Sequence, residues 1–178
     1  QTGNPQPIVT ETLPVNSNWA RLREAQRLTA KADGRAELAV INDLGETVDI
    51  HPLRKKEVAE RIGRCLDRLI YNNKVKLSPE VVSAEVQGDK VVLTLDQPVQ
   101  AGTVCDFELA GSDGRFVNAE ATADGNRITV LSPLAAHLSP LSLRYAWKDN
   151  PLRANVRSLS GLPMSSFEIS IPTLNAQP

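Results

Sequence analysis

The sequence of 178 residues is poor in residue types that mark several common protein classes. Aromatic residues make up 4% of it, there are two cysteines and two histidines, and the formal net charge is −1. Because phosphate binding needs clustered lysine and arginine, this balance and the lack of a long basic run argue against nucleic acid as the main partner. The short basic run at 54–56 is typical of the solvated first turns of a helix.

Long apolar runs are also lacking. No stretch approaches the roughly 18 apolar residues that span a bilayer, so we expect no membrane partner. Residues 1–18 are polar, rich in proline and asparagine, and begin without methionine, which is typical of a trimmed end rather than of a signal peptide. Cys65 and Cys105 lack the CxxC spacing of a zinc site. Their apolar surroundings favour buried free thiols over the one disulfide that they could form.

The first half of the chain has the pattern of an α/β protein. Ser17 is a suitable cap for a helix whose apolar stripe we expect to be buried. The stripe recurs at helical spacing and comprises Trp19, Leu22, Ala25 (or Gln26) and Leu28 (or Thr29). A short apolar run at 38–41 follows, and it predicts a strand that is buried on both faces, as in a parallel sheet.

A second amphipathic helix is expected after this strand and a polar loop. Pro52 suits its first turn, where the missing N–H costs little, and the helix should end near 71–73. Charged side chains lie opposite its apolar stripe, which comprises Val58, Ile62, Cys65, Leu66, Leu69 and Ile70.

Beyond residue 75 the hydrophobic period changes to two, which is typical of strands. Turn signals separate seven segments, at 84–86, 91–95, 105–110, 116–121, 127–131, 141–147 and 166–171. Short strands at this spacing predict a small β-sandwich. We therefore expect an α/β segment over residues 1–76 and a β-sandwich domain over 77–178.

His51 is the strongest candidate for chemistry. It follows the predicted strand, stands at a helix start, and has Asp49 two residues before it. An imidazole in this position could take a proton from a serine hydroxyl while a carboxylate fixes its tautomer; alternatively, the ring caps or packs at a loop. His137 lies in a predicted loop or strand edge and is interpreted as structural or exposed instead of as a ligand. No Gly-x-Ser-x-Gly elbow and no glycine-rich phosphate loop is present.

Several stretches together resemble the sialate O-acetylesterase family of the SGNH (GDSL-type) hydrolases. The resemblance covers about residues 17 to 168, and no single piece carries it alone. The pieces are WARLREAQ at 19–26, DIHP at 49–52 with the helix after it, FELAG at 107–111, DGRFV at 113–117, RYAW at 144–147, NP at 150–151 and GLP at 161–163.

This resemblance implies the C-terminal part of a flavodoxin-like α/β/α hydrolase followed by a β-domain. In that family a serine attacks the acetyl carbonyl; His51 matches the general base and Asp49 the orienting carboxylate. The superfamily usually writes this block Asp-x-x-His, so Asp43 or another carboxylate stays an alternative. The nucleophile block is absent from this chain, so the implied partners are an N-terminal fragment carrying the serine and an acetylated carbohydrate. A periplasmic or secreted location and no cofactor or metal are implied.

A different class of function stays open for the β-domain. It could be a carbohydrate-binding module, or it could only brace the catalytic sheet. Aromatic side chains that could form a sugar platform are few: Phe107, Phe116, Tyr145, Trp147 and Phe167. Alternation along a strand predicts that Tyr145 and Trp147 point to the same face, where core packing is the simpler interpretation.

Overall fold

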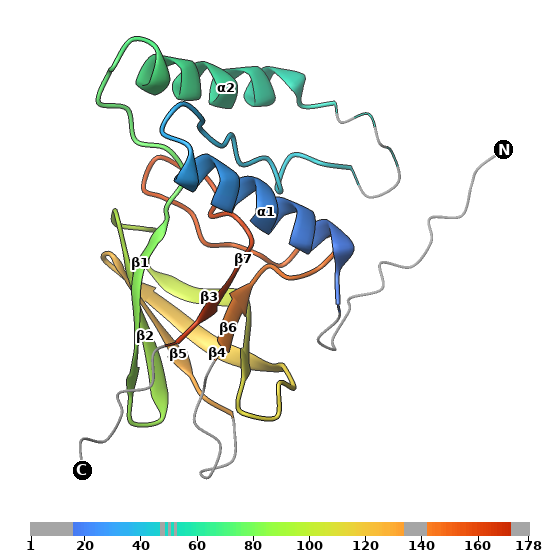
Figure 1. The fold of residues 1–178 in the computed structure, drawn as a ribbon, viewed down its shortest axis with the longest axis vertical. Helices are drawn as coiled ribbons and strands as arrows, with labels where there is room; N and C mark the ends of the chain where they lie inside the picture. The colour runs from blue at the N-terminus through green and yellow to red at the C-terminus, as the bar shows by residue number, and fades with distance from the viewer. Residues whose placement is uncertain (1–15, 47–48, 50, 52, 134–141, 172–178) are drawn as a thin grey trace, which may run out of the picture.

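The computed structural model describes residues 16–46, 49, 51, 53–133 and 142–171. Two helices precede seven strands along the chain. The helices are α1 (Asn18–Ala32) and α2 (Lys55–Leu69). The strands are β1 (Val81–Gln87), β2 (Lys90–Leu95), β3 (Gly102–Ala110), β4 (Val117–Asp124), β5 (Arg127–Leu131), β6 (Ser142–Tyr145) and β7 (Phe167–Ser170). Both helices lie beyond one end of the sheet, with α2 farther from it (Figure 1).

All seven predicted strands form, but they make one sheet instead of a sandwich. The strand order is β1-β2-β5-β4-β3-β6-β7, and every neighbouring pair is antiparallel. Because β3 pairs with β4 on one side and with β6 on the other, the hydrogen-bonded ladder runs unbroken where a sandwich would divide. A bulge between Val104 and Phe107, with Asp106 at a φ of 65°, bends β3 there.

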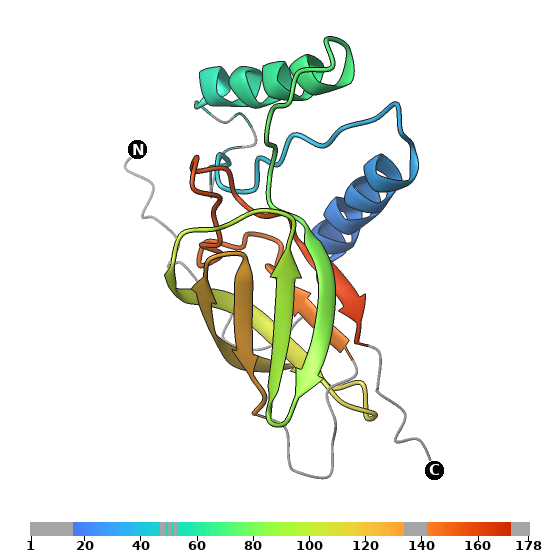
Figure 2. The same cartoon turned by 90° about the vertical axis from the view of Figure 1, so that its left-hand side faces the viewer.

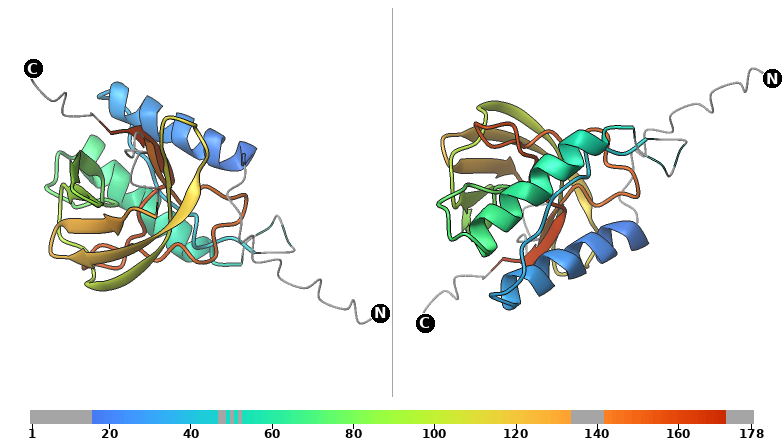
Figure 3. Two further views of the ribbon diagram at one scale, coloured as in Figure 1. Left: turned by 90° about the horizontal axis from the view of Figure 1, so that it is seen from below. Right: turned by 90° about the horizontal axis from the view of Figure 1, so that it is seen from above.

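The sheet curls on itself, as Figure 2 and the left view of Figure 3 show, and it encloses an apolar core. Alternate residues of β2 and β5 point inward, among them Leu93 and Ile128, which are fully buried. Tyr145 packs between Phe107 and Phe167, with ring centroids 4.8 and 5.9 Å away. The core is therefore built by the strands and by the connections between them, and among the described residues neither helix contributes to it.

Helix α1 begins where the sequence predicts, but the predicted buried face is wrong. The Ser17 hydroxyl caps the helix by accepting the Ala20 N–H at 2.9 Å. The apolar stripe faces solvent, with Trp19 60% exposed, whereas Glu24 and Arg27 on the opposite face are buried. The helix thus packs on β7 through its polar face and leaves its apolar stripe without a cover in the described chain.

Ion pairs and backbone contacts make this polar packing favourable. Arg23 donates to the Ser166 hydroxyl at 2.9 Å and to three carbonyl oxygens of residues 146–149. Arg27 pairs with Glu24 and with Glu80, both at 2.7 Å. Each buried charge therefore has a partner, as burial of charge requires.

Helix α2 has the predicted stripe but does not bury it. It begins at Lys55, so Pro52, which is outside the described residues, precedes the helix instead of occupying its first turn. Of the stripe, Cys65 is buried, whereas Ile62, Leu66, Leu69 and Ile70 are exposed. A helix face of this kind normally packs against another element.

The predicted strand at 38–41 does not form. The segment is extended and runs between α2 and the rest of the fold (Figures 1 and 2). No strand of the described residues pairs with it, and the carbonyl oxygen of Val40 instead accepts a hydrogen bond from Arg61 at 2.7 Å. A strand needs a neighbour for its backbone groups, and none is supplied here.

Both cysteines are free thiols, so the disulfide alternative is wrong. Cys65 is buried and Cys105 is half-buried, and burial raises the pKa of the Cys65 thiol. Across the part of the chain that the structure describes, no helix is long and apolar enough to cross a membrane. His137 and its predicted loop lie outside the described residues.

Candidate functional site

The structure brings Asp49 and His51 together on the loop that leads into α2. The Asp49 carboxylate accepts the backbone N–H of His51 through Oδ1 at 2.7 Å, and the same oxygen lies 3.2 Å from His51 Nδ1. This short-range geometry follows from the two-residue spacing, because an aspartate readily accepts the N–H two residues ahead. A carboxylate beside Nδ1 favours the tautomer with its proton there, and the Nε2 lone pair is then available as a base.

Both side chains are open to solvent. The His51 side chain is 81% exposed and that of Asp49 is 55% exposed. A base that must meet a substrate has to be accessible, and exposure satisfies this requirement. Exposure also leaves the Asp49–His51 pair screened by water, so the pair would be stronger with a protein surface over it.

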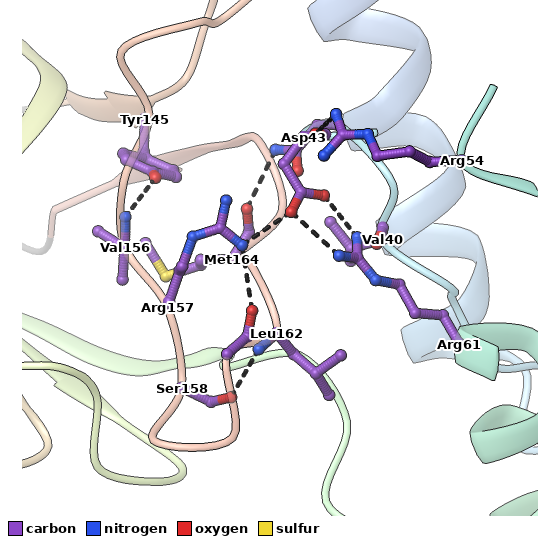
Figure 4. A network of polar contacts seen from close by, with 12 residues as sticks. Val40, Asp43, Arg54, Arg61, Tyr145, Val156, Arg157, Ser158, Leu162 and Met164 are labelled. Atoms are coloured by element: carbon purple, nitrogen blue, oxygen red, sulfur yellow. Dashed lines mark hydrogen bonds and ion pairs between the residues drawn. The ribbon is translucent and has the colours of Figure 1, made fainter. Parts of the chain in front are cut away.

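Asp43, the alternative carboxylate, has other partners. Its carboxylate lies between Arg61 and Arg157, with Oδ2 at 3.0 Å from Arg61 Nη2 and at 2.7 Å from Arg157 Nη1 (Figure 4). Burial raises the pKa of Asp43, but hydrogen bonds from the two arginines and their charges outweigh it and hold the pKa below its ordinary value. Asp43 is therefore an ionised anchor of this loop, and the carboxylate beside His51 is Asp49.

A nucleophile for His51 is not found in the described part of the chain. No serine hydroxyl there forms a hydrogen bond with His51, whose contacts are both with Asp49. Ser17 and Ser166 donate to other groups, and Ser158 pairs with Ser160. A hollow of about 920 Å³ on the sheet is lined by Lys90, Thr103 and Thr129 among others, and neither Asp49 nor His51 lines it.

The aromatic residues do not form a sugar platform. Phe107, Tyr145, Trp147 and Phe167 are buried. Phe116 is half-buried, with the guanidinium of Arg144 3.8 Å from its ring centre.

The prediction that Tyr145 and Trp147 share a face is wrong. β6 ends at Tyr145, and Ala146 has a φ of 52°, which breaks the alternation. Trp147 lies on the Arg144 side, 5.7 Å from that guanidinium, while Tyr145 packs in the core. The binding-module alternative therefore has no exposed aromatic surface among these residues.

No pattern in the sequence marks the arginines that hold the loop. Arg54 and Arg61 look like ordinary charged residues of an exposed helix face, and Arg157 lies 114 positions from its partner Asp43. Only the near absence of exposure marks Arg61, whose side chain is 12% exposed. No sequence pattern reports that value.

The chain shares its fold with part of a known ester hydrolase. A crystal structure of a carbohydrate acetylesterase from Xanthomonas citri matches 85% of this chain with a TM-score of 0.77 and 35% sequence identity. The chain spans 36% of the length of that protein. No protein-family model matches the sequence, and no curated protein matches it either. The comparison supports the carbohydrate-esterase class that the sequence resemblance implies.

Proposed function

We propose that the chain is the C-terminal portion of a carbohydrate O-acetylesterase of the serine-hydrolase type, with His51 as its general base. The observation that carries the proposal is the pairing of Asp49 Oδ1 with His51 Nδ1 at 3.2 Å, in a chain that matches 36% of a carbohydrate acetylesterase. The DIHP block, read as the last catalytic block of an SGNH hydrolase related to the sialate O-acetylesterases, is the finer form of the proposal.

In the proposed reaction, His51 Nε2 takes the proton of a serine hydroxyl as that oxygen attacks the acetyl carbonyl. Asp49 steadies the imidazolium that forms, and backbone N–H donors outside this chain hold the oxyanion. The imidazolium then gives its proton to the departing sugar hydroxyl. Water attacks the acetyl-enzyme with His51 again as base, which releases acetate and restores the serine.

The serine lies on the N-terminal portion in this proposal, and the exposed apolar faces support it. Trp19 and Leu22 of α1, and Ile62 and Leu66 of α2, face outward as if a protein surface covered them. The unpaired segment at 38–41 would add a strand to a parallel sheet of that portion. Acetylated sialic acid, xylan and xyloglucan are the candidate substrates, and a periplasmic or secreted location follows from them.

The first test is the intact mass of the native, size-purified protein under denaturing conditions. We expect either a second polypeptide in equal amount or one longer chain, in both cases with a serine nucleophile block. A single species of this chain's mass that releases acetate from an acetylated sugar would overturn the proposal.

The second test is replacement of His51 in the complete enzyme. His51→Ala should lower kcat by at least about 10³-fold with the fold unchanged by circular dichroism, because the base acts in every turnover. Asp49→Asn should cost less, and His137→Ala serves as the matched histidine control. Retention of most activity by His51→Ala would remove His51 from the mechanism.

A further inference from the structure

Asp43 is the point where the His51 loop, α2 and the β-sheet region meet (Figure 4). Its two carboxylate oxygens accept hydrogen bonds from the two terminal nitrogens of Arg61 on α2. One of these oxygens also accepts Arg157 from the connection between β6 and β7. The side chains of Asp43 and Arg61 are 14% and 12% exposed, so water screens the contact little.

Hydrogen bonds to core residues hold the backbone around Arg157 in place. The neighbouring Val156 is buried, and its N–H donates to the Tyr145 hydroxyl at 3.0 Å in the core. The N–H of Met164, which is also buried, donates to the carbonyl oxygen of Val156 at 3.0 Å. Arg157 itself donates to the Gly161 carbonyl oxygen at 3.1 Å, which holds the guanidinium in place beside Asp43. Through Arg157, the position of Asp43 is therefore fixed relative to the core of the β-sheet.

The same aspartate closes the loop that carries the proposed base. The guanidinium of Arg54, eleven positions later, donates to the backbone oxygen of Asp43. Asp49 and His51 lie between these two residues. Residue 43 begins this loop and Arg54 binds back to it, so a shift of Asp43 would displace both ends of the loop that carries His51.

We propose that Arg157 is a positioning residue for His51, which it places through the Arg157–Asp43 contact and the loop that Asp43 closes. The inference rests on the proposed function, because it assumes that His51 is the base. It makes the β-domain part of the catalytic apparatus, in contrast to an accessory module. Arg157 touches no reacting atom in this account.

The expected effect is on the chemical step. A displacement of about 1 Å at a catalytic group can cost about 10²-fold in rate. Arg157→Ala should therefore lower kcat by about 10-fold to 100-fold while KM changes by less than about 2-fold. Arg157→Lys should recover part of kcat, since an ammonium can reach the carboxylate but cannot also hold Gly161 with fork geometry.

The experiment measures kcat and KM of the complete enzyme with 4-nitrophenyl acetate, well below each variant's unfolding midpoint. Asp43→Asn is combined with Arg157→Ala in a double-mutant cycle. If Arg157 acts through Asp43, the double variant should lose no more kcat than Asp43→Asn alone. Arg153→Ala removes an exposed arginine from the same connection and is the matched control, which should keep the wild-type kcat.

The outcomes separate this inference from the proposed function. If His51→Ala abolishes turnover and Arg157→Ala keeps kcat, the positioning role is wrong and the function stands. If the losses of Asp43→Asn and Arg157→Ala multiply in the double variant, the route through Asp43 is wrong. If His51→Ala is active, the function itself fails, whatever Arg157 does.

Discussion

Replacement of Asp43 with asparagine tests the strength of the anchor under the His51 loop. The carboxylate accepts a two-nitrogen contact from Arg61 and one contact from Arg157, and its side chain is 14% exposed. Hydrogen bonds to charged groups contribute about 1.5 to 3 kcal/mol each. Asparagine keeps one acceptor oxygen but presents an N–H₂ group to an arginine. We expect Asp43→Asn to lower the free energy of unfolding by about 2 to 3 kcal/mol at pH 7.

The pH dependence gives this prediction its sign. The arginines hold the pKa of Asp43 in the folded state below its ordinary value, after they outweigh burial. The unfolded chain therefore binds the proton at higher pH than the folded chain does. The contribution of Asp43 is complete above the ordinary carboxyl pKa of about 4 and is lost as the pH falls through the lower folded-state pKa. The gap between wild type and variant should be constant above about pH 5 and should narrow below about pH 4.

Urea unfolding at a series of pH values measures that gap, with the fluorescence of the buried Trp147 as one probe. Asp124→Asn, at the exposed last residue of β4, is the charge-matched control and should change stability by less than about 0.5 kcal/mol. A gap below about 0.5 kcal/mol at pH 7 is the size of an ordinary surface change and would refute the role of Asp43 as an anchor. A gap that stays constant down to pH 3 would refute its ionic character.

Two other substitutions test the unusual packing of the helices. Arg27→Ala should lower the free energy of unfolding by about 3 kcal/mol in thermal or urea unfolding, because it leaves Glu24 and Glu80 without the guanidinium that pairs with them. Arg21→Ala, at an exposed arginine of the same helix, is its control, and equal effects of the two substitutions would contradict the role of the buried pairs. Trp19→Ser combined with Leu66→Ser should leave the stability of this chain within about 0.5 kcal/mol of wild type. It should weaken binding of the proposed N-terminal portion at least 10-fold in calorimetry, and unchanged binding would show that another surface covers the helices.

Local patterns predicted the elements well. The Ser17 cap, both helices and all seven strands follow from capping and hydrophobic period, which depend on residues close in sequence. The pairing of Asp49 with His51 is of the same local kind, since two residues separate the partners. The boundary between residues 76 and 77 stays a prediction.

Three predictions that depended on how elements pack against one another were wrong. The sequence pattern located the apolar stripe of α1, but burial depends on what packs against the helix. The described chain offers polar partners, among them Ser166 and Glu80, to the opposite face of the helix. The run at 38–41 has strand composition and no strand partner. The predicted sandwich is one sheet in the structure, because β3 pairs with β4 on one edge and with β6 on the other. Hydrophobic alternation along the strands is the same in either arrangement, so the sequence pattern could not distinguish them.

The sequence by itself determined the two helices, the seven strands of the sheet and the short contact between Asp49 and His51, because each rests on spacings of a few residues. The order of several short stretches along the chain indicated the class of enzyme that it resembles. Only the tertiary structure decided that α1 buries its charges and that Asp43 belongs to Arg61 and Arg157 and not to His51. These contacts join residues far apart in the chain, 144 positions for Glu24 and Glu168 and 114 for Asp43 and Arg157. Such pairs form when the fold brings two polar groups into one poorly hydrated place, and no local spacing encodes that meeting.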